Sequence, residues 1–359
     1  MGGIVNSQVF KQTGWTLEAL LPAPAGDDLE RLLAALEQQV SELEEKRETL
    51  SPEIDEADFL AIMRLYEEVQ IKLRRLGGYA HLWFAEDTQS QEALRFLGQM
   101  EQLLTDVQNR LLFLSLWWKG LEDEAAERLI AVSGDYAYYL EELRHFKPYT
   151  LSEAEEKVIN LKDVNGPNAL NKLYEMITNR FTFELEVEGE AQELTRAELG
   201  AYYRDPSPEM RAAAYQELYR VYSDEGAVLS QIYAHLVRDW ANENVSLRGF
   251  ASPIAVRNLS NDVPDPVVET LLDVCRENVS VFQRYFRLKA EWLGMERLRR
   301  YDVYAPLDEV ERECAYSAAV TMVLETLAQF SPVLSEHARR VFVDGHIDAE
   351  IRAGKRGGA

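Results

Sequence analysis

The sequence predicts a mainly α-helical protein with many helices, the first of them long and antiparallel, and one small β-hairpin near 181–194. Two observations predict this class. Apolar residues recur at intervals of three and four over most of the 359 positions, which is the spacing of one helix face. The stretch near 181–194 instead alternates apolar and polar residues, as strands do. Hydrophobic residues make up 47% of the chain, so we expect a folded protein.

The N-terminal third contains three long helical patterns. They cover 27–50, 56–86 and 90–121. Short turns separate them, so we expect antiparallel helices in a hairpin or bundle. The first carries an apolar stripe that we interpret as core: Leu29, Leu32, Leu33, Leu36, Val40 and Leu43. We expect Asp27 or Asp28 to cap this helix by accepting hydrogen bonds from its free amides.

Shorter helices follow, and then the pattern changes. In "YTLSEAEEKVIN", Ser152 and Glu155 have the spacing of a capping box at a helix start. The stretch "RFTFELEVEGEAQELT" predicts two strands that turn at Glu188 and Gly189. We expect this hairpin to mark a domain boundary, which divides the chain into 12–195 and 196–359.

The second half returns to helical spacing. We predict a helix or helix pair over 207–244, another over 264–294, and further helices up to about Phe342. Between them, "RRYDVYAP" at 299–306 predicts a short strand that Pro306 ends. The closing residues predict an extended segment.

Charge and composition exclude several classes of partner. The net charge of -24 repels phosphate backbones and anionic lipid, so we expect neither nucleic acid nor a membrane as partner. The N-terminal residues lack the apolar region of a signal peptide, so we expect a cytoplasmic protein. Cys275 and Cys314 are too few for a disulfide framework, and we expect two buried, reduced thiols.

The chain has no complete motif for catalysis. Its five histidines are His81, His145, His235, His337 and His346. A helical zinc protease needs two histidines four residues apart in H-E-x-x-H, and no pair has that spacing. Nucleophile-elbow and phosphate-loop motifs are absent from the sequence as well. We therefore predict no catalytic residue and no zinc ligand in the chain.

Other candidate side chains have ordinary explanations. If 344–348 were a strand, Asp344, His346 and Asp348 would face one side and could converge on a cation, although any solvated strand has this spacing. Glu336 next to His337 is interpreted as a surface pair or a local salt bridge. We interpret three tyrosines as packing between helices with their hydroxyls in contact with water: Tyr136, Tyr138 and Tyr139.

The closing residues are suited to contact with another peptide. Glycine lets a second backbone come close, and an extended segment can capture a peptide through main-chain hydrogen bonds. Lys355 and Arg356 would offer charge for a carboxylate. A flexible basic end is the alternative. The candidate cleft residues are Gly354, Lys355, Arg356, Gly357, Gly358 and Ala359.

Four segments in order resemble one family. They are "LRHFKPYTLSEAEEKVIN", "LSNDVPDPVVETLLD", "RRYDVYAPL" and "FVDGHIDAEIRAGKRGGA". They are similar to oligoendopeptidase F, of the thimet oligopeptidase-like zinc peptidases, over 12–359. The resemblance implies a multi-helix peptidase fold around a channel for short peptides, with zinc held by H-E-x-x-H and a later glutamate. It also implies that 354–359 line the substrate cleft.

The missing motif limits what the resemblance implies. We expect a truncated chain: an N-terminal helical domain over 12–195 and an incomplete peptidase domain over 196–359. Alone it should bind no zinc and hydrolyse nothing, although the intact protein would do both. A helical peptide-binding or scaffold protein without catalysis is the alternative. Helices of 207–342 would expose an apolar face, which favours self-association.

Overall fold

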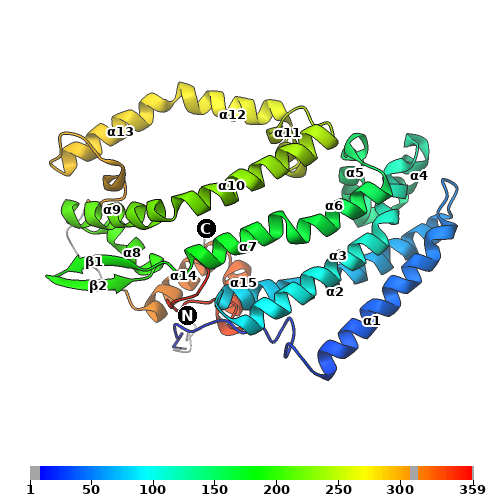
Figure 1. The fold of residues 1–359 in the computed structure, drawn as a ribbon, viewed down its shortest axis with the longest axis horizontal. Coiled ribbons are helices and arrows are strands. Elements are labelled where there is room, and N and C mark those ends of the chain that lie inside the picture. The colour runs from blue at the N-terminus through cyan, green and yellow to red at the C-terminus, as the bar shows by residue number, and fades with distance from the viewer. Residues whose placement is uncertain (1–8, 308–313, 358–359) are drawn as a thin grey trace.

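The computed structural model describes residues 9–307 and 314–357. It is mainly helical with one two-stranded antiparallel sheet, so the predicted fold class is confirmed (Figure 1). None of the helices in these ranges is both long enough and apolar enough to cross a membrane.

The N-terminal half consists of helices, and the three longest lie side by side (Figure 1). Their bounds are α1 (Asp27–Glu45), α2 (Glu56–Glu86), α3 (Gln91–Gly120), α4 (Asp123–Val132), α5 (Ala137–His145), α6 (Glu153–Asn165) and α7 (Pro167–Thr178). The three long patterns expected from the sequence match α1 to α3 closely. One apolar core joins α1 to α5, and it includes the predicted residues Leu36, Val40 and Leu43.

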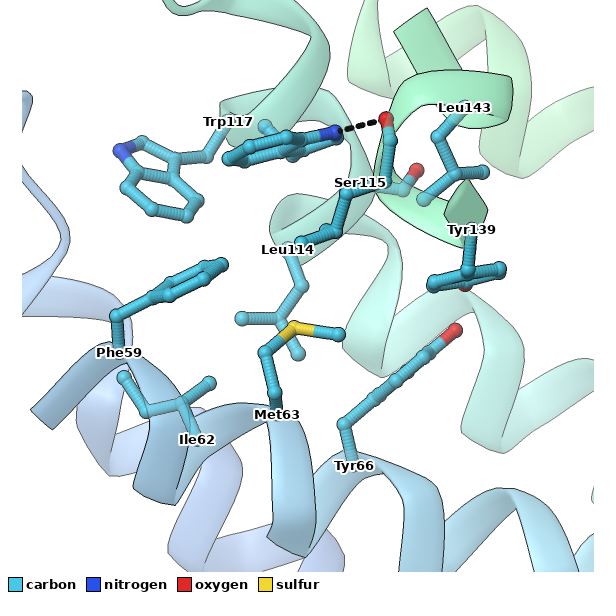
Figure 2. Close-up of a pocket in the computed structure, with 11 residues that line it drawn as sticks. Phe59, Ile62, Met63, Tyr66, Leu114, Ser115, Trp117, Tyr139 and Leu143 are labelled. Carbon is cyan, nitrogen blue, oxygen red and sulfur yellow. Dashed lines mark hydrogen bonds between the residues drawn. The ribbon is translucent and has the colours of Figure 1, made fainter. Parts of the chain in front are cut away.

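Aromatic packing fixes α3 against α2 and α5. Phe59 of α2 stacks on Trp118 of α3 with ring centroids 5.7 Å apart. The Trp118 indole donates a hydrogen bond of 2.9 Å to the Leu140 carbonyl of α5 (Figure 2). The apolar cavity beside these rings, lined also by Met63, has a volume of about 30 Å³. This is about the volume of one water molecule, so the cavity belongs to the core and is not a ligand site.

Helix starts show where local sequence decides the structure. The capping box at α6 is confirmed: Ser152 Oγ accepts from the Glu155 amide, and the Glu155 carboxylate accepts from the Ser152 amide. The predicted aspartate cap of α1 is wrong. Gly26, with φ 98°, precedes the helix, and Asp27 and Asp28 fall inside its first turn. There their charges favour the positive end of the helix dipole instead.

The hairpin forms as predicted and starts a second core. Strands β1 (Phe183–Val187) and β2 (Glu190–Leu194) are antiparallel, with Phe183 opposite Leu194. Glu188 and Gly189 both have positive φ, 54° and 84°, as tight hairpin turns require. The buried side chains of this core come from both strands and two later helices: Phe183, Leu185, Leu194, Leu199 and Ala214.

The second half is also helical but less compact. Its elements are α8 (Arg196–Ala201), α9 (Pro208–Asp224), α10 (Gly226–Trp240), a π-helix (Ala241–Leu247), α11 (Pro253–Ser260), α12 (Asp265–Glu277), α13 (Val279–Trp292), α14 (Tyr316–Phe330) and α15 (Pro332–Val343). Helices α9 to α13 run along one side of the molecule, opposite α1 to α3 (Figure 1).

Two expectations for this half are wrong. The predicted strand over 299–306 is a 3-10 helix, Arg300–Asp302, followed by turns, because the Asp302 carboxylate accepts from the Arg299 amide and closes the backbone. The predicted burial of the two thiols is also wrong. Cys275 and Cys314 are exposed, and α12, which carries Cys275, has no buried residue.

The exposed apolar face expected in this half is present. Helices α12 and α13 have few contacts beyond their immediate neighbours. Large apolar side chains on them are exposed, including Val267, Leu271, Phe282, Phe286 and Trp292. The closing segment after α15, residues 344–357, forms neither helix nor strand.

A buried ion pair joins α9 to the 3-10 helix. Arg211 and Asp302 are almost fully buried and lie 2.9 Å apart. Arg211 also donates to the carbonyls of Asp205 and Pro206. Burial alone would raise the pKa of Asp302, but hydrogen bonds from Arg299 and Arg211 lower it below its usual value. The pair therefore stabilises the fold above the unfolded-state pKa and weakens as the pH falls through the folded-state pKa.

Replacing Asp302 with alanine should lower the free energy of unfolding by about 3–5 kcal/mol, because the Arg211 charge would stay buried without its partner. Denaturation followed by tryptophan fluorescence measures this change. Asp273→Ala is the matched control, since Asp273 and Arg276 form an exposed pair that contributes at most about 1 kcal/mol. Equal losses in the two variants would contradict this role.

Candidate functional site

The closing segment crosses the end of α2 and is held there by main-chain hydrogen bonds. The bonded pairs are Gly345 with Thr16, Ala349 with Thr13, Gly354 with Thr88, and Arg356 with Ala85. The Gly354 carbonyl accepts twice, from the Thr88 amide at 2.8 Å and from its hydroxyl at 2.9 Å. These bonds join residues more than 250 positions apart, so the closing segment brings distant parts of the chain together.

Gly354 is required at this crossing. Its φ of 78° is a conformation that other residues rarely adopt. A Cβ atom there would lie 2.5 Å from Asp87 Oδ1, well inside van der Waals contact. Gly357, by contrast, has no atom within 4 Å of its would-be Cβ.

The charges of this segment are already paired within the protein. The Lys355 ammonium donates to the carbonyls of Asp348 and Glu350, at 2.7 and 2.9 Å. Arg356 forms an ion pair of 2.7 Å with Glu175 of α7. The expectation that these two cations are free for a carboxylate is therefore not met. They fix the shape of the segment instead.

The alternative cation site at Asp344, His346 and Asp348 is not formed. The segment is not a strand, so the alternation that would bring the three together is lost. The Asp348 carboxylate is buried and bonds Arg352 at 2.7 Å. Burial alone would raise the pKa of Asp348, but this bond and the charge of Lys355 lower it.

A groove of about 410 Å³ opens beside the closing segment. Its walls come from the end of α7, from α8, from α9 and from 349–357. The predicted cleft residues Gly354, Lys355, Arg356 and Gly357 all line it, whereas Gly358 and Ala359 lie outside the described residues. That this groove takes substrate stays a prediction.

Two other groove residues were not predicted from the sequence. Arg196, the first residue of α8, is exposed and forms no ion pair with any residue that the structure describes. Its guanidinium lies 5.7 Å from the centre of the Tyr222 ring. Tyr203 also lines the groove, and its hydroxyl has no protein hydrogen-bond partner there. Burial raises the Tyr203 pKa to about 12, so this hydroxyl stays a donor at neutral pH.

A second cavity, of about 640 Å³, lies between α6, α10 and the π-helix. On one side Arg248 bonds Glu156 and Glu243, each at 2.8 Å. On the other side, Asp163 faces Asp239 and Glu243. Burial, and then the charges of Glu243 and Asp239, raise the pKa of Asp163 to about 6. Carboxylates thus outnumber the cationic side chains that line this cavity.

Comparison with known proteins identifies the fold and the family. A family model described as oligopeptidase F matches residues 117–183, and one described as peptidase family M3 matches 201–359. The chain belongs to the oligoendopeptidase F family. The group B oligopeptidase PepB of Streptococcus agalactiae is 28% identical over 235 residues, which cover 62% of this chain and 37% of PepB.

Two further relatives of the family extend this likeness. Oligopeptidase PepF of Bacillus subtilis is 21% identical over 99% of this chain and 53% of its own length. The crystal structure of oligoendopeptidase-F from Enterococcus faecium has a TM-score of 0.66 at 19% identity, covering 87% of this chain and 66% of that one. The chain thus spans about a third to a half of the curated relatives.

The family implies a metal ion, typically zinc, and the described residues do not form the two-histidine ligand set of a zinc peptidase. Zinc peptidases of this kind use two histidines and a carboxylate. Over 9–307 and 314–357, the clusters close enough to hold a metal are Glu142 with His145 and Asp262, and Asp163 with Asp239 and Glu243. Neither holds two histidines. We therefore derive no catalytic step through a metal on these residues.

Gly354→Ala should free the closing segment from α2. A left-handed alanine costs about 1–2 kcal/mol, and the clash with Asp87 adds to it. Hydrogen exchange of the Thr88 amide, which donates to Gly354, should rise about tenfold or more. The matched control is Gly357→Ala, which meets no atom and should change this exchange little. An unchanged Thr88 amide in Gly354→Ala would contradict the account.

Asp163→Asn should stabilise the fold near pH 8 by about 1–3 kcal/mol. A folded-state pKa of about 6, above the ordinary value of 3.8, means that the fold favours the protonated acid. Native Asp163 therefore stabilises the fold at low pH, and this contribution is lost as the pH rises through about 6. Urea denaturation near pH 5 and pH 8 measures the difference. An equal gain at both pH values would contradict it.

Proposed function

We propose that this chain forms the helical half, and one wall of the peptide channel, of a metal-dependent oligopeptidase. Residues 12–195 act as its N-terminal domain and 196–359 as part of its peptidase domain. The groove beside the closing segment carries this proposal, because it is built where the two halves of the chain meet. Membership of the peptidase family supports short peptides as the substrate class.

The groove is suited to hold one end of a short peptide. Backbone of 349–357 runs along one wall and offers main-chain groups to an extended chain. Arg196 supplies a guanidinium without a carboxylate partner among the described residues. A planar guanidinium binds a carboxylate through two parallel hydrogen bonds. We therefore assign Arg196 to the C-terminal carboxylate of the peptide.

Binding and hydrolysis should separate in this chain. Peptide hydrolysis in the family depends on a zinc ion, which activates the attacking water. The sequence contains no H-E-x-x-H, and the metal clusters of the described residues lack the two histidines. The 359 residues alone should thus bind short peptides without cleaving them. Zinc would be the cofactor of a protein that also supplies the motif.

The exposed thiols support a cytoplasmic location. Cys275 and Cys314 are both free and accessible. Such thiols persist in a reducing compartment and are oxidised outside it. The net charge of -24 is consistent with the same place. The exposed apolar side chains of α12 and α13 further support self-association of the isolated chain.

A labelled pentapeptide tests the carboxylate assignment. The purified chain should bind the free-acid form about tenfold more tightly than the C-terminal amide, because a hydrogen bond to a charged group contributes about 1.5–3 kcal/mol. Arg196→Ala should remove this preference. Arg180→Ala is the matched control, since Arg180 is exposed nearby but does not line the groove. Fluorescence anisotropy measures all affinities.

Two outcomes would contradict the proposal. If the amide binds as tightly as the acid, Arg196 does not receive the carboxylate. If the chain cleaves a quenched fluorescent peptide, and a chelator stops the cleavage, these residues hold a catalytic metal after all. Binding without cleavage also fits a peptide-binding scaffold. A protein extended by a segment carrying H-E-x-x-H distinguishes the two, because it should gain hydrolysis only under our proposal.

A further inference from the structure

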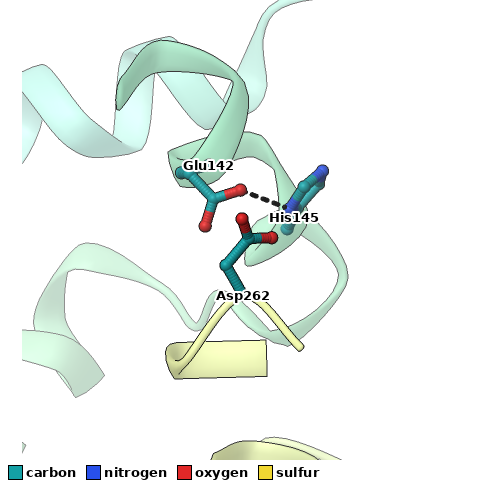
Figure 3. A group of neighbouring side chains, drawn as sticks. All are labelled: Glu142, His145 and Asp262. Carbon is teal, nitrogen blue, oxygen red and sulfur yellow. Dashed lines mark ion pairs between the residues drawn. The ribbon is translucent and has the colours of Figure 1, made fainter. Parts of the chain in front are cut away.

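Three side chains from distant parts of the chain meet at the surface near α5. Glu142 and His145 lie on α5, and Asp262 lies in the turn between α11 and α12 (Figure 3). One ligand atom of each lies within 4.8 Å of the other two. The His145 Nδ1 atom is 3.2 Å from a Glu142 carboxylate oxygen. The cluster lies outside the groove.

Local structure holds these groups in place. Positions three apart on a helix share one face, which brings Glu142 and His145 together. Asp262 has a positive φ of 51°, and its amide bonds the Leu259 carbonyl at 3.1 Å, so the turn fixes its backbone. The Tyr138 hydroxyl donates a hydrogen bond to the Asp262 carboxylate. Tyr138, which is also on α5, therefore orients the Asp262 carboxylate.

The charges of the cluster are not balanced. Within the described chain, neither Glu142 nor Asp262 forms an ion pair with a lysine or arginine. Figure 3 shows the two carboxylates facing each other beside the imidazole. With neutral histidine the cluster carries two negative charges. Carboxylates this close repel each other, and a bound cation would remove the repulsion.

We propose that Glu142, His145 and Asp262 bind one divalent transition-metal ion, with Zn²⁺ the best fit. An imidazole nitrogen with two carboxylate oxygens suits zinc, whereas calcium and magnesium prefer oxygen alone. Zinc bonds of about 2.0–2.2 Å require ligand atoms no more than about 4.4 Å apart. The three ligand atoms lie within 4.8 Å of one another, so the spacing has to close by no more than a few tenths of an ångström. Tyr138 is a positioning residue, because it orients a ligand without touching the ion.

The site would link two parts of the chain. Helix α5 belongs to the region matched by the first family model, and Asp262 belongs to the second. An ion held by both fixes the turn from which α12 starts. Helices α12 and α13 have few contacts beyond their immediate neighbours, so an ion at this turn would add a link between them and α5. The ion would therefore stabilise the position of α12 and α13 relative to α5.

Calorimetric titration of the purified full chain with Zn²⁺, after chelator treatment and dialysis, tests the proposal. Co²⁺, bound in place of Zn²⁺, has an absorption spectrum that depends on its ligands and so reports on them independently. We expect one bound ion. His145→Ala should lower its affinity about tenfold or more, and Tyr138→Phe should lower it less. The matched control His235→Ala removes an exposed histidine of α10 that belongs to no cluster, and should bind as the native chain does.

Several results would overturn the site. They are the absence of binding, equal affinity in His145→Ala and the native chain, and loss of binding in Asp163→Asn, which would place the ion in the acidic cavity. A shift of the Co²⁺ spectrum in Asp262→Asn would support the assignment. No peptide enters these measurements, so their outcome is independent of the proposed peptide binding.

Discussion

The hydrogen bonds between Thr88 and Gly354 are the contact on which the groove depends. They join residues separated by 266 positions and place the closing segment across the end of α2. Ordering such a distant contact costs chain entropy. The two hydrogen bonds to the Gly354 carbonyl offset this cost, and so do the ion pairs of Asp348 with Lys355 and Arg352. Without this crossing, the groove would lose one wall.

Local signals explain why much of the fold could be predicted. The bounds of α2 and α3, the capping box at Ser152 and the turn at Glu188 each depend on residues within a few positions. The errors share the opposite cause. The segment 299–306 alternates like a strand, but Asp302 pairs with Arg211, 91 positions away, and with Arg299, and this closes it into a turn.

The candidate site could be predicted only in part. The sequence placed Gly354 to Gly357 at a cleft through a family resemblance, and these residues do line a groove. It could not show that Lys355 forms an ion pair with Asp348, and Arg356 with Glu175. Arg196 was missed for the same reason. An arginine at a helix start becomes notable only when its surroundings are known to contain no carboxylate partner.

The distribution of ligands explains how binding and hydrolysis can lie in different parts of one protein. A groove for a peptide end needs backbone groups and one guanidinium, and residues 178–357 provide both. Hydrolysis needs a metal ion whose ligands lie within a few tenths of an ångström of their ideal bond distances. Two histidines one turn apart on the same helix meet this requirement because the helix fixes their spacing. The histidines here lie on separate elements, and His145 meets only carboxylates. Under the proposed function, these residues recognise the peptide and support the groove, and hydrolysis depends on ligands outside the described residues.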